Sequence, residues 1–231
     1  MSVFYTDRAE AGSALAAAVA ERLVAESLGE RRDPHEVPLV LGLPRGGVPI
    51  ARQVAAAVHG ELDVVVARKI GVPWHRELGV GAVTVDGPAL FDEALLAQVG
   101  IRLADLADDV EREREEARRR TQLYRDDRPA PTVAGRTVIV VDDGLATGAT
   151  ARAALRRLRA ESPGHLVFAA PVCAPQAVAI LRAEADEVLC VCAPPEFRAV
   201  GYFYRSFPQL TDDEVMAELR AARHDAAALR L

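Results

Sequence analysis

The chain has 231 residues, half of them apolar, which is enough to bury one substantial core, so we expect a single domain over residues 1–231. Its formal net charge of −6 argues against a nucleic-acid partner, because such proteins usually carry clustered positive charge. No apolar run reaches the roughly 18 to 20 residues of a membrane span, and residues 1–10 contain no signal-like stretch, so we expect a cytoplasmic protein with no membrane partner.

The first part of the chain alternates helical patterns with short apolar runs. Asp7 to Leu28 has apolar residues at helical spacing, and Gly29 to Pro38 breaks that pattern. Val37 to Leu43 is a continuous apolar run that predicts a buried strand, followed by a glycine turn and a helix over Val48 to His59. Leu62 to Ala67 predicts a second buried strand.

Residues 71–128 interrupt this alternation with a long and varied segment. Within it, Gly79 to Val83 predicts an extended piece, and Leu103 to Tyr124 predicts a charged helix. We expect an insertion over the edge of the sheet, with Gly71 to Leu90 as a mobile cover of the site.

The alternation then resumes. Its expected elements are a strand over Val138 to Val141, a helix over Ala149 to Ala160, a strand over Leu166 to Ala170, a helix over Pro175 to Ala183 and a strand over Glu187 to Cys192. Repeated strand–helix units of this kind predict an α/β fold, with a doubly wound, mainly parallel open sheet and helices on both faces.

The C-terminal residues 194–231 gather aromatic side chains, including Phe197 and Tyr202, close to three prolines. Such a cluster serves either as core or as a surface that stacks on a base, and both interpretations stay open. Cys190 and Cys192 alternate on a predicted strand without a neighbouring histidine, so we interpret them as core thiols rather than metal ligands. Three cysteines are also too few for a disulfide framework.

The strongest motif is Val138 to Thr150 (VIVVDDGLATGAT), where a buried strand ends in Asp142 and Asp143 and a small, hydroxyl-bearing loop opens a helix. Ligands of open α/β sheets bind at the carboxyl ends of the strands, and a helix N-terminus beside glycine binds anions through its amides. Phosphate is therefore expected on Leu145 to Thr150 (Leu145, Ala146, Thr147, Gly148, Ala149, Thr150). Adjacent carboxylates accept hydrogen bonds from vicinal hydroxyls, so the motif predicts a ribose 5-phosphate site.

This motif resembles the one that binds 5-phosphoribosyl-1-pyrophosphate (PRPP) in type I phosphoribosyltransferases. The resemblance covers 13 positions, from Val138 to Thr150, and departs from the family pattern at Gly144, where the family usually has an aliphatic residue. A second segment, Leu41 to Gly47 (LGLPRGG), resembles the family's pyrophosphate loop, which places Arg45, Gly46 and Gly47 at the pyrophosphate. We also expect a non-proline cis peptide at Pro44–Arg45 or at the next bond.

Lys69 is the only lysine among 28 basic residues, and it follows Arg68 after the second apolar strand. A compact ammonium kept among so many arginines suggests a specific role, although an ordinary surface lysine is the alternative. The resemblance implies that Arg68 and Lys69 contact the pyrophosphate as well. Longer similarities, including the Phe197 to Gly201 segment, point to a bacterial subgroup of the same family.

The resemblance implies transfer of the phosphoribosyl group of PRPP to a nitrogen nucleophile, expected to be a nucleobase, with pyrophosphate as the leaving group. Asp142, Asp143, Lys69 and Arg45 would then form the catalytic set, and Mg²⁺ would be held through PRPP and water rather than by protein ligands. Phe197 and Tyr202 are weak candidates for a hood over the acceptor. A homodimer is left open.

Two alternatives remain at the level of sequence. A protein of the same fold could sense PRPP without transferring anything, but such regulators usually append a DNA-binding domain, for which the expected N-terminal helix is too little. A dinucleotide-binding oxidoreductase would need a G-x-G-x-x-G turn after the first strand, which is absent.

Overall fold

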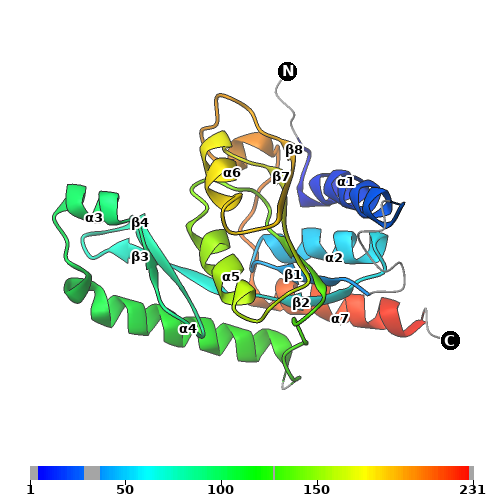
Figure 1. Ribbon diagram of the computed structural model, residues 1–231, viewed down its shortest axis with the longest axis horizontal. Helices are drawn as coiled ribbons and strands as arrows, with labels where there is room; N and C mark the ends of the chain where they lie inside the picture. The colour runs from blue at the N-terminus through cyan, green and yellow to red at the C-terminus, as the bar shows by residue number, and fades with distance from the viewer. Residues whose placement is uncertain (1–4, 29–36, 127, 229–231) are drawn as a thin grey trace.

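The computed structural model describes residues 5–28, 37–126 and 128–228 (Figure 1). The predicted break at Gly29 to Pro38 lies almost wholly outside these ranges. Within them, no helix is both long and apolar enough to cross a membrane. The elements in chain order are α1 (Arg8–Leu28), β1 (Leu39–Gly42), α2 (Gly47–Ala57), β2 (Glu61–Val64), β3 (Ala67–Val72), β4 (His75–Thr84), β5 (Leu90–Phe91), α3 (Glu93–Val99), η1 (Leu103–Leu106), α4 (Ala107–Arg125), β6 (Thr137–Val141), α5 (Ala149–Arg159), β7 (His165–Val172), α6 (Pro175–Leu181), β8 (Glu187–Cys192), η2 (Val200–Phe203) and α7 (Asp212–Ala228).

A five-stranded sheet of order β2-β1-β6-β7-β8 forms the centre, and every neighbouring pair in it is parallel. The middle strand is β6, whose five residues are all buried. This burial explains its unbroken apolar run, because a strand covered on both faces has no solvated side to mark with polar residues.

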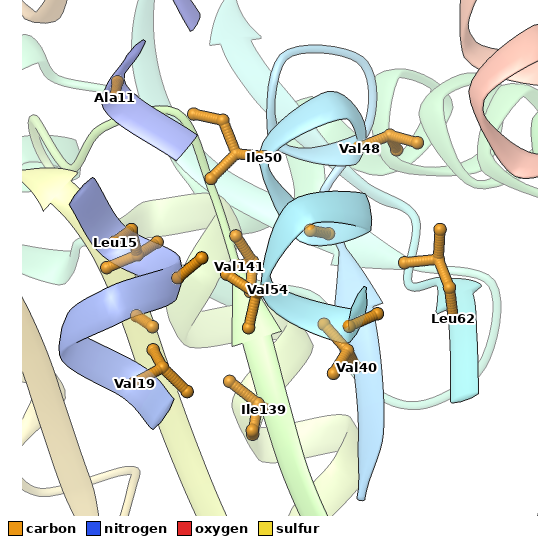
Figure 2. Packing of buried hydrophobic residues seen from close by; sticks show 14 of the residues in the cluster. Ala11, Leu15, Val19, Val40, Val48, Ile50, Val54, Leu62, Ile139 and Val141 are labelled. Atoms are coloured by element: carbon orange, nitrogen blue, oxygen red, sulfur yellow. The ribbon is translucent and has the colours of Figure 1, made fainter. Parts of the chain in front are cut away.

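Helices cover both faces of this sheet. On one face, Leu15 and Val19 of α1 and Val54 of α2 pack against Val40 and Ile139 of the strands (Figure 2). Because successive strand residues point to opposite faces, the alternate residues meet α5 and α6 on the other side. That second cluster includes Val138, Val140, Leu155, Leu158, Phe168 and Leu181. The predicted α/β fold with a doubly wound sheet is therefore confirmed.

The segment between β2 and β6 forms a separate small layer, which stands out to one side of the central sheet in Figure 1. Strands β3, β4 and β5 make an antiparallel sheet, and β3 and β4 also pack against α5. The predicted extended piece and charged helix are confirmed as parts of β4 and α4. This layer has a core of its own, made by Ile70, Val72, Val80, Val83, Leu96, Ile101 and Leu106. Its role as a mobile cover stays a prediction.

The prediction of one strand over Leu62 to Ala67 is wrong. Strand β2 ends at Val64, and Ala67 already begins β3 in the second sheet. All six residues are buried, so the apolar run continues through the point where the chain changes sheets. The hydrophobicity of the sequence does not reveal where the chain leaves the central sheet, because the residues on both sides of this break lie in the interior.

Shortening a buried side chain of β6 should show how much the packing of this strand contributes to stability. Ile139→Ala should lower the free energy of unfolding by about 2 to 5 kcal/mol, because it leaves a cavity in a fully buried site. Ile180→Ala is the matched control, because that side chain is 46 % exposed and its loss should cost less than about 0.5 kcal/mol. Chemical denaturation of both variants measures the difference, and equal losses would contradict the assigned packing.

Candidate active site

The acidic pair lies at the carboxyl end of the central strand. Asp142 and Asp143 directly follow β6, and the backbone N–H of Asp143 donates to the Asp142 carboxylate at 2.8 Å. The side chain of Asp143 keeps only 15 % of its surface exposed. Burial, followed by the charge of Asp143, raises the pKa of Asp142 well above its ordinary value. Burial also raises the pKa of Asp143, while Arg8 opposes that shift.

The loop after this pair is anchored at one end and open in its middle. Leu145 is buried, its N–H donates to the Val172 carbonyl at 2.9 Å, and its carbonyl accepts from Ala174 at 2.7 Å. Ala146 and Thr147 are exposed. The amide of Leu145 is therefore already bonded within the protein and attaches the loop to the end of β7, while the phosphate contact of Leu145 stays a prediction.

Helix α5 begins at the end of this loop. Gly148 precedes it with a left-handed φ of 79°, which favours glycine, and Ala149 and Thr150 form the first turn. No hydrogen bond in the described ranges uses the N–H groups of Ala149 and Thr150 as donors. Orphan amides of this kind form the anion-binding end of a helix.

The glycine loop after β1 touches the acidic pair. A Cβ on Gly46 would lie 1.8 Å from Oδ2 of Asp143, so only glycine fits this approach. The predicted non-proline cis peptide is confirmed at Pro44–Arg45. The N–H of Gly47 donates to the Leu43 carbonyl at 2.9 Å and closes the turn, and the place of Gly47 at the pyrophosphate stays a prediction. The amides of Arg45 and Gly46 remain as candidate donors.

The predicted cations lie in three different settings. Arg45 is one-third exposed, with Nη1 3.9 Å from Oδ1 of Asp212 at the start of α7. Arg68 turns towards α4, where Nη2 lies 2.9 Å from Oε2 of Glu113. The guanidinium of Arg68 is thus paired with α4, and its contact with the pyrophosphate stays a prediction.

Lys69 lies on the opposite face of β3 and is exposed. It is paired with Ala82, which packs in the same cluster as Leu43 and Leu145, the residues next to the two loops. Its aliphatic stem crosses Gly79, where an added Cβ would lie 2.5 Å from Cδ of Lys69. The only lysine thus lies on the face of the hairpin that packs against the central sheet and its helices, within β3 rather than after the strand predicted over residues 62–67.

Arg8, at the first position of α1, is a site residue that the sequence reasoning missed. Its Nε and Nη2 both lie 2.8 Å from Oδ2 of Asp143, and Nη1 donates to the Pro208 carbonyl at 2.7 Å. The guanidinium carbon also lies 3.9 Å from the centre of the Phe207 ring. No local pattern marked this arginine, because its partners are more than a hundred positions away in the chain.

The two predicted hood residues lie in different environments. Phe197 stacks on Phe203, with ring centres 5.4 Å apart, and packs against both main clusters. Tyr202 is 61 % exposed. Of the two interpretations of the aromatic tail, core packing is therefore confirmed for Phe197, whereas Tyr202 stays a candidate for contact with a ligand.

The departure at Gly144 has a steric explanation. A Cβ at this position would lie 2.4 Å from Cγ1 of Val200, so the C-terminal segment packs directly on the loop that carries the acidic pair. An aliphatic side chain at position 144 would displace Val200. The glycine therefore reflects close contact between loop and tail.

A cavity of about 840 Å³ lies away from the acidic pair, between the β5–α3 segment and helices α5 and α6. Its lining includes none of the predicted site residues, and Arg152 and Arg156 within it are already paired with Glu184. We place the site at the acidic pair, because the two loops, the unpaired amides and the buried carboxyl groups converge there.

Comparison with known proteins gives three consistent similarities. A family model described as "Phosphoribosyl transferase domain" matches residues 85–197, which include the acidic pair and its loop. The crystal structure of TT1426 from Thermus thermophilus aligns with a TM-score of 0.73 and 41 % identity, over 94 % of this chain and 97 % of that one. The "Putative phosphoribosyl transferase Rv0571c" of Mycobacterium tuberculosis strain H37Rv is 41 % identical over 96 % of this chain.

The doubly wound sheet, the acidic pair at the end of its central strand and these similarities define the class of protein. The chain belongs to the type I phosphoribosyltransferase family. It spans about half the length of the curated relatives it matches, namely 48 % of Rv0571c and 48 % of its counterpart MT0597 in strain CDC 1551.

The contact between Gly144 and Val200 can be tested by a double-mutant cycle. Gly144→Ala should destabilise the chain by about 1 to 3 kcal/mol, because the β-branched Val200 has little freedom to move aside. Val200→Ala removes the clashing methyl groups, so Gly144→Ala should cost less in that background. Strictly additive losses in chemical denaturation would show that the two residues do not press on each other.

Proposed function

We propose that this chain transfers the 5-phosphoribosyl group of PRPP to the nitrogen of a small acceptor, most simply a nucleobase, and releases pyrophosphate. The single observation that carries the proposal is the contact between two loops: the acidic pair after β6 lies against Gly46 of the glycine loop after β1. A ligand at this point meets carboxyl groups, a helix N-terminus and a cation-bearing loop together. PRPP has the matching diol, phosphate and pyrophosphate.

The proposed division of labour follows from charge. The 5-phosphate is assigned to Ala146, Thr147 and the first turn of α5, where hydroxyl and amide donors are available. A carboxylate repels a phosphate but accepts hydrogen bonds from hydroxyls, so Asp142 and Asp143 are assigned to the ribose. The pyrophosphate is assigned to the amides of Arg45 and Gly46, with Lys69 as a further cation.

Family membership implies Mg²⁺, and the donor set fits it. Mg²⁺ keeps several waters and is usually held by one or two carboxylates together with substrate phosphates. The described residues contain no cluster of three or more candidate ligands, but Asp142 and Asp143 offer carboxylate oxygens beside the proposed diol. These two residues would hold the ion through its waters. When bound, Mg²⁺ would supply neutralisation of the pyrophosphate charge.

The chain's own residues would contribute mainly orientation and electrostatics. Asp142 and Asp143 hold the ribose hydroxyls while positive character develops on the ring at the anomeric carbon. Arg45 and Lys69 stabilise the negative charge that develops on the departing pyrophosphate. The acceptor nitrogen forms the new bond to the anomeric carbon as the bond to the pyrophosphate oxygen breaks. Tyr202 is the exposed aromatic candidate for contact with the acceptor.

Pyrophosphate release tests the activity directly. The chain is incubated with PRPP, Mg²⁺ and each member of a panel of nucleobases, and the expected result is release that depends on one or a few of them. Binding of PRPP without transfer to any acceptor would favour a PRPP sensor of the same fold. Absence of both binding and transfer would overturn the proposal.

Neutralising the acidic pair should separate ligand binding from folding. The double variant Asp142→Asn with Asp143→Asn keeps the side-chain size but removes both charges, so PRPP affinity or transfer should fall. Thermal stability without ligand should change less than ligand binding, because the loss of the Arg8–Asp143 ion pair is offset by the loss of repulsion between the two carboxyl groups. Thr147→Val removes one hydroxyl donor and should cost about 1 to 3 kcal/mol of PRPP affinity. Calorimetry with PRPP and Mg²⁺ measures both effects, and unchanged affinity in both variants would contradict the assigned roles.

Lys69→Ala should weaken PRPP and pyrophosphate binding while the fold stays intact, because the side chain is exposed. Lys69→Arg should restore binding only in part, since a planar fork replaces a compact ammonium. Arg76→Ala is a matched control for loss of an exposed cation on the same hairpin. If Lys69→Ala and the control bind PRPP equally well, Lys69 has no part in the site.

A further inference from the structure

We propose that Asp212 and Tyr124 are positioning residues for the pyrophosphate: Asp212 holds the guanidinium of Arg45 in place, and the buried Tyr124 fixes Asp212. Neither residue is among those that the sequence predicted for the site. Both act through Arg45 and not on the ligand itself. The inference rests on the proposed function, in which Arg45 stabilises the departing pyrophosphate.

The first turn of α7 lies beside the glycine loop because α7 packs on α2, the helix that follows this loop (Figure 1). Val215 of α7 is buried in the same cluster as Val48 and Val54 of α2. Arg52 of α2 adds an ion pair, with Nη1 2.9 Å from Oε2 of Glu218. These contacts bring the first residue of α7 to the loop that carries the proposed pyrophosphate contacts.

That first residue, Asp212, is not needed as the cap of its helix. The hydroxyl of Thr211 accepts from the N–H of Glu214 at 3.2 Å, and the Glu214 carboxylate accepts from the N–H of Thr211 at 2.7 Å. This reciprocal pair is a capping box, which satisfies a helix N-terminus. Asp213 and Glu214 also supply the negative charge that a first turn favours. The contacts of the Asp212 side chain lie outside its own helix instead.

Tyr124, near the end of α4, fixes the Asp212 carboxyl group. Its side chain is fully buried, and its hydroxyl donates to Oδ1 of Asp212 at 2.6 Å. Burial raises the pKa of Tyr124, so the hydroxyl keeps its proton and remains a donor at neutral pH. Burial opposes ionisation of Asp212, but the hydrogen bond from Tyr124 and the neighbouring arginines hold its pKa below the ordinary value. Asp212 therefore presents a negative charge at a fixed point.

Arg45 is attracted to this carboxylate without being hydrogen-bonded to it. Its Nη1 lies 3.9 Å from Oδ1 of Asp212, which is within the range of an ion pair but too long for a hydrogen bond. Among the described residues, the Arg45 side chain donates no hydrogen bond. The guanidinium thus keeps its donors for a ligand, while the charge of Asp212 limits where it can move.

The other arginines near Asp212 are held by a different partner. Nη2 of Arg119 lies 3.6 Å from Oδ2 of Asp212, but the same nitrogen donates to Glu116 at 3.0 Å. Arg120 donates to Glu116 as well, at 2.7 Å. Arg45 is therefore the neighbouring cation that Asp212 is best placed to orient.

Two roles for Asp212 differ in the sign of their effect on ligand binding. A carboxylate that only added negative charge would repel pyrophosphate, so its removal would strengthen pyrophosphate binding. A carboxylate that positions Arg45 has the opposite effect, and its removal weakens that binding. Tyr124→Phe leaves the net charge unchanged, so this variant isolates the contribution of positioning.

Calorimetry with inorganic pyrophosphate and Mg²⁺ measures this sign. Asp212→Asn should weaken pyrophosphate binding by about three- to tenfold, and Tyr124→Phe should weaken it as well. Asp213→Asn is the matched control, because it removes an exposed carboxylate from the same turn, and it should not weaken binding. Ribose 5-phosphate, which lacks the pyrophosphate, should bind to the wild type and to all three variants with the same affinity.

A double-mutant cycle assigns the effect to Arg45. In an Arg45→Gln background, Asp212→Asn should no longer weaken pyrophosphate binding. Unchanged or tighter pyrophosphate binding in Asp212→Asn would overturn the inference. Equal losses for pyrophosphate and ribose 5-phosphate would overturn it too, because they would indicate a general structural role.

Two further outcomes are separated by the same measurements. If Asp212→Asn fails to fold, Tyr124→Phe decides by the same comparison of the two ligands. A wild-type chain that binds ribose 5-phosphate but not pyrophosphate would overturn the inference alone. A wild-type chain that binds neither ligand would reject the proposed function, and the inference with it.

Discussion

The site depends on the burial of two neighbouring carboxyl groups at the end of the central strand. Strand β6 has neighbours on both sides and helices on both faces, so the residues that follow it emerge in a largely enclosed position. Enclosure favours the neutral form of an acid, and a second acid beside it favours that form further. The buried pair is stabilised by a proton, by a neighbouring cation or by the hydroxyls of a ligand. In the structure, Arg8 is the neighbouring cation.

Close approach of backbone to side chain explains the glycines around this pair. Gly46 admits Oδ2 of Asp143, and Gly144 admits Val200 of the tail. Each glycine removes a Cβ at a point where two segments distant in sequence meet. The site is thus assembled by contacts among the first helix, two loops and the C-terminal segment, and a substitution at any of these glycines acts on more than one of them.

Much of the fold and of the central motif was predictable from the sequence, for identifiable reasons. Buried strands such as β6 carry unbroken apolar runs, and the order of carboxylates, glycine and hydroxyls in the next loop matches one kind of ligand chemistry. The same signal failed at residues 62–67, because burial continues across the change from the central sheet to the hairpin. Leu145 and Gly47 were expected at the ligand, yet the N–H of Leu145 donates to Val172 of β7 and the N–H of Gly47 donates to Leu43, which only the three-dimensional arrangement reveals. Arg8 was missed because its contact with Asp143 spans 135 positions of the chain.

The central claim is that the acidic pair and the neighbouring loops together form a PRPP site. Calorimetric titration of the wild-type chain with PRPP in the presence of Mg²⁺ tests it most directly. Saturable binding is expected, and it should weaken as the salt concentration rises, because the ligand is a multiply charged anion. Absence of binding at millimolar PRPP would contradict it.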